Sequence, residues 1–201
     1  MAELTKFEQW WLNAWPHRWH IRRHVPRFLK ACPEPFRGQV LEVGAGAGWT
    51  SQRILETFPQ VELTATDIDV HVNEQFRQLQ TVYGQRLKFR QADVLQLPFD
   101  RNSFDVVLAV YVMHHLDDAT LGLQQLLRVL RPGGLLGILD GHQKYSEGLA
   151  SWLPRRSQAI NRTMLEEILR AEDCQLRVGE GERRYMIWAQ KAYPITPPPA
   201  A

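Results

Sequence analysis

Short apolar runs alternate along this chain with segments whose apolar residues recur at helical spacing. The runs end at glycine, proline or acidic residues, as strands do when they enter loops. The apolar runs predict strands over 39–43, 61–66, 87–90, 104–110 and 135–140. The helical spacing predicts helices over 51–58, 70–83, 119–130 and 163–171.

The order of these elements predicts an α/β fold. The run FDVVLAV, Phe104 to Val110, is apolar at nearly every position, which is typical of a strand covered on both faces. Strands that alternate with helices through short connections form a parallel sheet with helices on both sides. Two further strands, 175–178 and 185–190, lie too close together for a helical crossover and form an antiparallel hairpin around a glycine-rich turn. We expect a doubly wound, Rossmann-like sheet of seven strands, mostly parallel, with one antiparallel strand from the C-terminal hairpin.

A length of 201 residues suits one domain with a complete core. We expect this domain to span residues 38–192, from the first strand to the last. Residues 1–37 form an N-terminal segment rich in aromatic and basic side chains. Residues 193–201 form a proline-rich tail that cannot pair in a sheet, so we expect it to be disordered.

The first predicted strand runs into a glycine-rich stretch, LEVGAGAGWT, at residues 41–50. Ligands of such sheets bind beyond the carboxyl ends of the strands, so this turn is a candidate cofactor site. The dinucleotide fingerprint G-x-G-x-x-G would place its third glycine at Trp49, where an indole obstructs the close helix–strand packing. Glu42, two residues before the first glycine, would repel a pyrophosphate and attract a cationic amine. The stretch therefore favours a nucleoside cofactor with a positive group over a dinucleotide.

Two further acidic residues follow neighbouring predicted strands. Asp67 ends the second strand, where a carboxylate can accept both hydroxyls of a ribose. Asp93 ends the third strand with Val94 and Leu95 behind it, and an acceptor beside apolar walls suits the amine and flat face of adenine. Each acid alone has a structural alternative, Asp67 as a helix N-cap and Asp93 as a surface turn residue. An amine, a ribose and an adenine together describe S-adenosylmethionine.

Four segments, in this order and spacing, resemble the class I S-adenosylmethionine-dependent methyltransferases, in the group that includes the ubiquinone and menaquinone C-methyltransferases. They read LEVGAGAGWT, TATDID, QADVLQLPFDRNSFDVVLAVYVMHHLDD and LLRVLRPGGLLGILD, and cover roughly residues 38 to 141. The closing hairpin also fits the fold of that family. The resemblance implies S-adenosylmethionine as the methyl donor and S-adenosylhomocysteine as the product.

The resemblance also implies which residues hold the cofactor. In that family the glycine loop contacts the methionine portion, the acid before it helps bind the amino group, and the acid after the second strand binds ribose. An acidic and hydrophobic pair after the third strand brackets adenine, and backbone after the fourth strand lines the cofactor. The matching positions here are Glu42, Gly44, Ala45, Gly46, Asp67, Ile68, Asp93, Val94, Val110 and Tyr111.

The catalytic requirement is modest, because a sulfonium methyl is already a strong electrophile. The protein has mainly to align the acceptor and exclude water. A general base is needed only for an acceptor that does not release its proton easily. His115, His114 and Tyr111 follow the fourth strand, beside the expected methyl position, and are the candidate catalytic residues; either histidine has capping or packing under the next helix as its alternative. We expect His115→Ala to slow methyl transfer without abolishing cofactor binding.

Several classes of methyl acceptor are disfavoured because the sequence lacks the patterns typical of enzymes that act on them. Residues 109–112 read AVYV, not the Asn/Asp-Pro-Pro-Tyr/Phe signature of methylases that act on amino groups of nucleic acids or proteins. No acidic cluster for a metal-dependent catechol-type enzyme follows the fourth strand, and the two distant cysteines, Cys32 and Cys174, do not suffice for arsenic methylation. We expect a small-molecule or lipid-like acceptor, no nucleic-acid partner and no metal. A catalytically silent cofactor-binding scaffold and an NAD-dependent oxidoreductase are the alternatives.

Composition is that of an ordinary globular protein, with 44% hydrophobic and 23% charged residues. A net charge of +2 is too small to argue for nucleic-acid binding by itself. The cysteines sit in no metal-ligand spacing, which indicates free thiols in a reducing compartment. The sequence has neither an apolar run of about 18 residues nor the residue order of a signal peptide, so we expect a cytoplasmic location.

Two segments are candidate lids. The N-terminal stretch FEQWWLNAWPHRWHIRRHVPRFLK combines tryptophans with basic residues, and we expect Pro16 to interrupt or restart its helix. It is interpreted as a lid over the cofactor, as a weak membrane-surface contact or as plain core packing. The connection 141–162 lies at another strand end and is interpreted either as a lid or as a solvated helix start. As a lid, its side chains able to reach the acceptor are His142, Tyr145, Trp152, Arg155 and Arg156.

Overall fold

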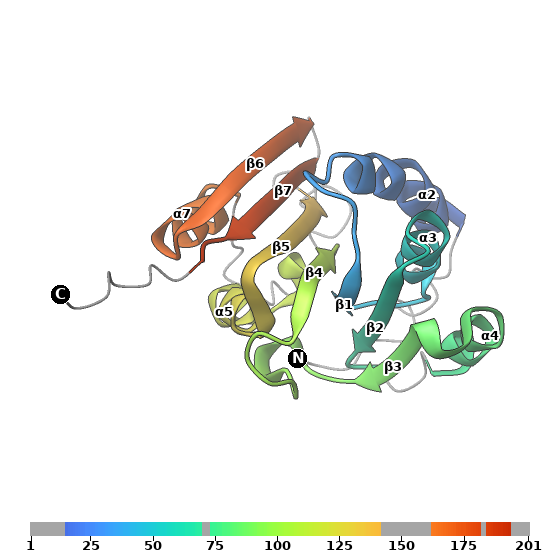
Figure 1. Cartoon of the computed structure of the whole chain (residues 1–201). Helices are drawn as coiled ribbons and strands as arrows, with labels where there is room; N and C mark the ends of the chain where they lie inside the picture. The colour runs from blue at the N-terminus through green and yellow to red at the C-terminus, as the bar shows by residue number, and fades with distance from the viewer. Residues whose placement is uncertain (1–14, 70–72, 142–161, 182–183, 194–201) are drawn as a thin grey trace.

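A seven-stranded sheet forms the centre of the computed structural model, which describes residues 15–69, 73–141, 162–181 and 184–193 (Figure 1). The strand order is β3-β2-β1-β4-β5-β7-β6. The strands are β1 (Gly38–Val43), β2 (Val61–Asp67), β3 (Leu87–Gln91), β4 (Phe104–Val110), β5 (Leu130–Gly141), β6 (Cys174–Gly181) and β7 (Arg184–Lys191). All neighbours pair in parallel except at β7, which is antiparallel to both β5 and β6. The predicted fold class is confirmed.

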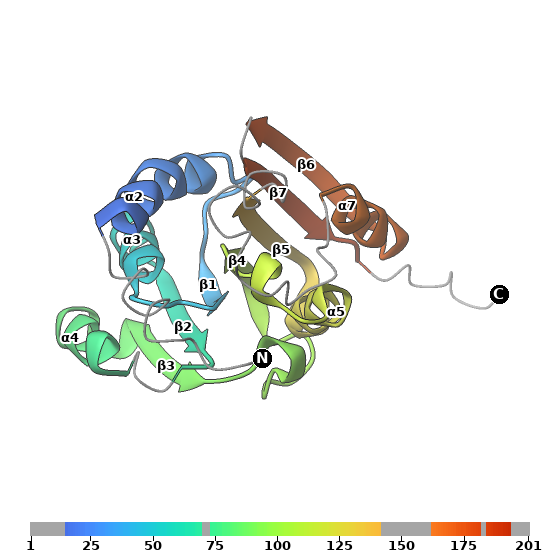
Figure 2. The same ribbon diagram turned by 180° about the vertical axis from the view of Figure 1, so that it is seen from behind.

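Helices cover both faces of this sheet. Those described are α2 (Trp15–Lys30), α3 (Trp49–Thr57), α4 (Asn73–Tyr83), α5 (Ala119–Val129) and α7 (Arg162–Ala171), with short 3-10 turns η2 (Gly84–Arg86), η3 (Val94–Gln96) and η4 (Met113–His115). Helices α2, α3 and α4 lie on one side of the sheet, and α5 and α7 lie on the other (Figures 1 and 2).

The central strand β4 shows why its sequence is apolar throughout. Val106 and Leu108 pack in the cluster that contains residues of α2, α3 and α4. Val107 and Ala109 pack in the opposite cluster with residues of α5 and α7. All four are at most 3% exposed. Alternate side chains of a strand point to opposite faces, so a strand covered on both sides has no polar position left.

Several element boundaries differ from the prediction. The helix predicted to end at Leu130 ends at Val129, and β5 already begins at Leu130, which pairs with Phe104. The segment Arg131–Gly134, predicted only to stop the helix, therefore lies within β5, where the register to β4 shifts. Near the C-terminus, Gly179 pairs with Met186 inside β6 and so is not part of the expected turn.

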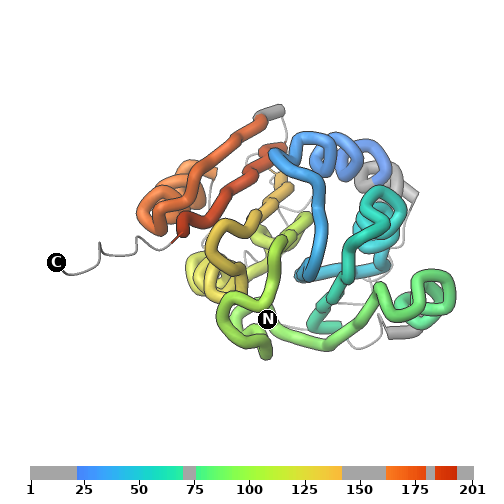
Figure 3. The backbone as a smooth tube through the Cα atoms, viewed as in Figure 1, coloured from blue at the N-terminus to red at the C-terminus, as the bar shows by residue number. Residues whose placement is uncertain are grey.

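The N-terminal segment contributes part of the core. Phe28 in α2 stacks on Trp188 of β7 with ring centroids 4.6 Å apart, and the indole Nε1 donates to the Phe28 carbonyl at 3.2 Å. Pro16, expected to interrupt the helix, is the second residue of α2, where proline is tolerated. Residues 1–14 lie outside the described residues, so the lid and membrane interpretations of that part stay predictions. Figure 3 traces the backbone from α2 into β1.

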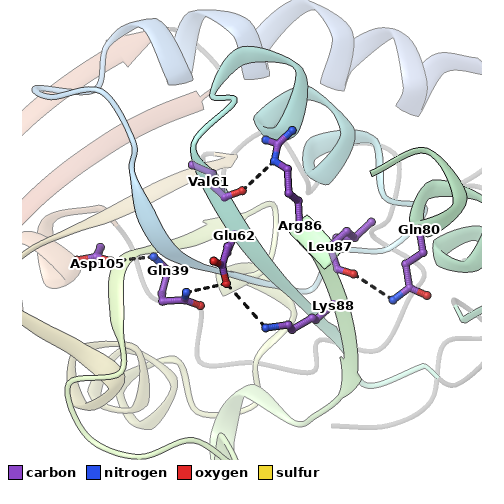
Figure 4. A network of polar contacts seen from close by, with 8 residues as sticks. All are labelled: Gln39, Val61, Glu62, Gln80, Arg86, Leu87, Lys88 and Asp105. Carbon is purple, nitrogen blue, oxygen red and sulfur yellow. Dashed lines mark hydrogen bonds and ion pairs between the residues drawn. The ribbon is translucent and has the colours of Figure 1, made fainter. Parts of the chain in front are cut away.

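Polar side chains at the amino ends of the strands pair with one another (Figure 4). The Gln39 backbone N–H donates to Asp105 Oδ2 at 2.7 Å, and its side-chain amide donates to Glu62 Oε2 at 2.9 Å. Lys88 Nζ lies 3.9 Å from the same Glu62 oxygen. Arg86 donates from Nε to a backbone carbonyl of β2. This edge of the sheet is held by structural contacts, so the search for a site moves to the carboxyl ends.

The contact between Trp188 and α2 gives a test of the fold. Trp188→Ala is expected to cost about 3–5 kcal/mol in the free energy of unfolding, because it removes a fully packed indole and its hydrogen bond to Phe28. In urea denaturation the midpoint should fall with little change in slope. Val82→Ala, at a residue 73% exposed, is the control and should stay within about 0.5 kcal/mol of wild type. Equal effects of both substitutions on the free energy of unfolding would contradict a role of the Trp188–α2 contact in stabilising the fold.

Candidate cofactor and acceptor site

The strand order reverses at β1. This strand lies between β2 and β4, with Glu42 opposite Ala65 on one side and Leu108 on the other. The chain builds β2 and β3 outward from one side of β1 and β4 and β5 outward from the other. Parallel strands that leave such a point open a crevice beyond their carboxyl ends, where ligands bind in folds of this kind.

The glycine loop after β1 needs its glycines. Gly44, Gly46 and Gly48 have φ angles of 63°, 50° and 75°, which L side chains rarely adopt. A Cβ on Gly44 would lie 2.4 Å from Val112 Cγ2, so the loop packs directly against the segment that follows β4. A Cβ on Gly46 would meet nothing within 4 Å. The loop is thus closed toward the protein at Gly44 and open at Gly46, where a ligand has room.

Asp67 joins the carboxyl end of β2 to this loop. Its Oδ2 accepts the Gly46 N–H at 2.8 Å, and its Oδ1 accepts the Asp69 N–H at 3.0 Å. Burial raises the pKa of Asp67, and the backbone donors oppose that shift. The Ile68 backbone N–H also acts on this carboxylate, whose two oxygens together have about four lone-pair positions. The geometry fits the predicted contact with ribose hydroxyls.

Glu42 is a buried carboxyl directly before the loop. It is 1% exposed, and the Ser51 hydroxyl of α3 donates to its Oε2. Burial raises its pKa to about 8; the Ser51 hydrogen bond opposes this and the charge of Asp67 adds to it. A buried acid with no cation beside it in the described structure binds a proton tightly, and a ligand ammonium group would supply the missing charge.

The predicted adenine pair lies at the carboxyl end of β3. The strand ends at Gln91, one residue beyond the predicted range 87–90, and Asp93 caps η3 by accepting the Leu95 N–H on Oδ1 at 2.9 Å. This contact is the turn role that the sequence left open for Asp93. Val94 is 2% exposed, and Ile68 after β2 is partly buried.

The other predicted residues gather at the end of β4. Ala45 and Val110 are each 7% exposed, and the Ala45 N–H donates to the Thr66 carbonyl at 2.9 Å. Tyr111 has a left-handed φ of 58°, and its N–H donates to the Leu139 carbonyl of β5 at 2.8 Å. The glycine loop, β4 and β5 therefore meet where the sequence placed the cofactor and the reaction.

The two adjacent histidines have different surroundings. His114 Nδ1 lies 2.6 Å from Asp140 Oδ1, and the His114 backbone N–H donates to Asp140 Oδ2 at 3.2 Å. Asp140 is fully buried, whereas the His114 side chain is 45% exposed. The His115 ring packs against that of His114 with centroids 3.9 Å apart. The structure thus pairs His114 with a carboxylate that the sequence had not assigned to the site.

The pair shifts the titration of both groups. Partial burial by itself lowers the pKa of His114, but the charge of Asp140 and its hydrogen bond outweigh this, so the pKa is raised. Burial by itself raises the pKa of Asp140, but the His114 ring and two backbone N–H groups, of Gly141 and His114, bring it below its ordinary value. Asp140 is therefore ionised, and Nδ1 carries the proton that it accepts. The neutral ring then has Nε2 as its basic nitrogen.

Tyr111 and Arg184 complete this end of the sheet. Burial raises the pKa of Tyr111 to about 12; the guanidinium of Arg184 opposes this and the charge of Asp140 adds to it. Arg184 lies opposite Gly141 in the β5–β7 pairing, which places it beside the carboxyl end of β5. The loop residues predicted to approach the acceptor, 142–156, lie outside the described residues.

Neither a metal site nor a membrane span is found in the described ranges. They bring no three His, Cys, Asp or Glu side chains together as a metal-binding group. None of their helices has both the length and the apolar composition needed to cross a bilayer.

Residues 40–134 match the family model described as a methyltransferase domain. This segment of the chain is similar to a methyltransferase domain. Its matched residues run from β1 into β5 and include the glycine loop, Asp67, Asp93 and His114. The sequence resemblance to the S-adenosylmethionine-dependent group is confirmed.

Curated relatives match more than half of the chain. The ubiquinone/menaquinone biosynthesis C-methyltransferase UbiE of Desulfotalea psychrophila is 31% identical over 115 residues, which are 57% of this chain and 46% of that protein. O-methyltransferase resE of Aspergillus sclerotiorum is 33% identical over 120 residues, 55% of this chain and 44% of that one. The chain thus spans about half the length of these curated relatives.

A solved structure extends the match in fold to nearly the whole chain. A SAM-dependent methyltransferase from Aquifex aeolicus superposes with a TM-score of 0.70 at 18% identity, covering 94% of this chain and 100% of that one. At this identity the likeness concerns the Rossmann-like fold alone.

Glu42→Gln tests the buried carboxyl. Wild-type Glu42 keeps its proton to about pH 8 in the folded state but only to about 4.5 when unfolded, so the free energy of unfolding falls as pH rises through this window. Glutamine still offers an oxygen that accepts from the Ser51 hydroxyl, but it does not ionise, so the variant lacks this fall in the free energy of unfolding. Without ligand, Glu42→Gln should melt roughly 5–10 °C above wild type at pH 8 and close to wild type near pH 4.5.

Glu56→Gln is the matched control, because Glu56 is a half-exposed acid on the neighbouring helix and pairs with Arg53. Its melting temperature should stay near that of wild type at both pH values, since exposed ion pairs contribute little. A Glu42→Gln variant that is less stable than wild type at pH 8 would show that the buried carboxylate is favourable in the free protein.

Proposed function

We propose that this protein is an S-adenosylmethionine-dependent methyltransferase that acts on a small-molecule or lipid-like acceptor. One observation carries the proposal: a buried carboxyl, an open glycine turn and the Asp67 carboxylate lie together at the carboxyl ends of β1 and β2. These groups complement an ammonium group, the backbone-contacting part of a ligand and a ribose. A dinucleotide would bring its pyrophosphate toward Glu42, and this anion would not supply the positive charge that the buried carboxyl lacks.

Each residue has a definite task in this proposal. When bound, S-adenosylmethionine supplies a methyl group activated by a sulfonium. Glu42 attracts the ammonium group, and Asp67 accepts hydrogen bonds from the ribose while it holds the glycine loop through Gly46. Asp93 and Val94 offer an acceptor and an apolar wall to adenine. The residues after β4, including Tyr111 and His114, face the acceptor side.

The acceptor class rests on the relatives' names and on missing sequence signatures. One relative is named for carbon methylation in quinone biosynthesis and another for oxygen methylation, so the shared domain is used with different acceptor atoms. The N-terminal segment before α2, as a lid or a membrane-surface contact, would help select an apolar acceptor. A cytoplasmic location is part of the same proposal.

Calorimetry with S-adenosylmethionine, S-adenosylhomocysteine and NAD separates the cofactor alternatives. We expect binding of the first two and none of NAD. Asp67→Ala should weaken S-adenosylmethionine binding by about 100-fold, because it removes two charge-assisted hydrogen bonds to ribose and releases the Gly46 N–H. Asp100→Asn removes an exposed carboxylate before β4, at the opposite end of the strands, and should leave the affinity unchanged.

Two results would contradict this proposal. Binding of NAD in preference to S-adenosylmethionine would favour an oxidoreductase, and equal affinity of the two variants would remove Asp67 from the site. A screen of acceptors for S-adenosylhomocysteine release then separates an enzyme from a scaffold that only binds the cofactor.

A further inference from the structure

The contact between Asp140 and His114 bears on the chemical class of the methyl acceptor. The inference rests on the proposed methyl transfer. We propose that His114, held by Asp140, is the general base, and that the acceptor is a compound with an ionisable hydroxyl, such as a phenol, methylated on oxygen. His114 is the catalytic residue in this proposal, and Asp140 is a positioning residue that acts through it.

The geometry leaves one nitrogen of the ring for chemistry. Asp140 accepts from the ring at Nδ1 and from the backbone N–H of His114, so the carboxylate fixes both the peptide and the imidazole. The carboxylate is fully buried while the histidine side chain is 45% exposed. The ring therefore presents Nε2 away from Asp140. A buried acid that orients a neutral histidine in this way favours proton uptake at Nε2, because the imidazolium is stabilised by the carboxylate.

A structural role alone does not require this arrangement. Backbone capping needs only the contacts from the His114 N–H to Asp140 Oδ2 and from the Gly141 N–H to Oδ1. Oδ1 lies in addition 2.6 Å from a ring that is nearly half exposed. His115 has the same chemistry and a neighbouring position, yet the described structure pairs Asp140 with His114. The choice of one histidine over its neighbour indicates a requirement for a base at that place.

Charges around the pair also suit an acceptor that becomes anionic. On the β5 and β7 side the ionisable neighbours are Arg184, Tyr185 and the Tyr111 hydroxyl, and the Arg184 charge acts on that hydroxyl. On the η4 side His115 packs against His114, and Asp117 and Asp118 follow in the chain before α5, where Asp118 caps the helix by accepting the Leu121 N–H. A cation beside a buried hydroxyl favours a negative oxygen nearby.

The proposed step balances as a proton transfer coupled to methyl transfer. The acceptor O–H proton moves to His114 Nε2, and the electron pair left on oxygen forms the new O–C bond to the methyl group. The sulfur–carbon bond breaks, its electron pair stays on sulfur, and a neutral thioether results. The imidazolium then gives its proton to water. Acceptors that lack such a proton, such as tertiary amines, have no use for the base.

An NMR titration of the imidazole groups tests the pair without any acceptor. The His114 signal, assigned by its loss in His114→Gln, should titrate above the ordinary histidine value of about 6.5 in the full-length protein. In Asp140→Asn its pKa should fall by about one unit or more, because the carboxylate charge is gone. Asp100→Asn controls for the loss of one negative charge and should leave it unchanged. A His114 pKa at or below the ordinary value in wild type, or one unmoved by Asp140→Asn, would overturn the proposal.

A series of substituted phenols then tests the acceptor class, with a matched tertiary amine and S-adenosylhomocysteine release as the readout. For phenols with a pKa of about 10, His114→Gln should lower kcat about 10²- to 10⁴-fold while S-adenosylmethionine affinity stays unchanged. For phenols acidic enough to be ionised at the assay pH, the loss should shrink toward nothing. Asp140→Asn should move the acidic limb of the pH–rate profile to lower pH. Asp100→Asn, at an exposed carboxylate at the opposite end of the strands, should keep the wild-type dependence of rate on phenol pKa.

The remaining results of these experiments would each contradict one part of the proposal. A loss in His114→Gln that is equal across the phenols, or a methyl group found on ring carbon, contradicts the base or the oxygen acceptor. S-adenosylmethionine binding with turnover of the amine alone, or of no hydroxyl compound, contradicts the acceptor class. Failure to bind S-adenosylmethionine at all contradicts the proposed function itself, and calorimetry distinguishes this from the other results.

Discussion

The parallel pairing of β1 with both β2 and β4 is the constraint on which the site depends. It brings the carboxyl ends of three strands to one edge and lets the glycine loop contact the segment after β4, where Gly44 meets Val112. The Asp67 carboxylate then fixes the loop by accepting the Gly46 N–H. Loss of that register would separate the loop, Asp67 and the histidines, although each would still be present in the sequence.

The two ends of the sheet use acidic residues differently. At the amino ends, Asp105 and Glu62 accept from Gln39 and pair with basic groups, so their charges stabilise the fold (Figure 4). At the carboxyl ends, Glu42 is buried beside a neutral hydroxyl and its pKa rises. Such a group lowers stability at neutral pH, which is a cost expected of a residue kept for binding rather than for folding. The contrast locates the functional edge by energetics as well as by topology.

His114 and His115 differ in their contact with an acidic residue from a distant strand. Both follow β4, and adjacency in the chain gives them equal access to the crevice on sequence grounds. Asp140 comes from β5, 26 residues later, and reaches His114 because β4 and β5 pair in parallel up to Val110 and Leu139. His114 is therefore the proposed base, while the expectation that His115→Ala slows methyl transfer stays a prediction.

Local patterns in the sequence determined the order of strands and helices, the glycine loop, and the acids at Glu42, Asp67 and Asp93, because each depends on residues close together in the chain. They also determined the type of cofactor to expect, since the acid before the loop and Trp49 after it disfavour a pyrophosphate. Only the tertiary structure placed Leu130 in a strand, buried Glu42 against Ser51, and paired His114 with Asp140. These features depend on strand register and burial between distant segments, which no local pattern of residues encodes.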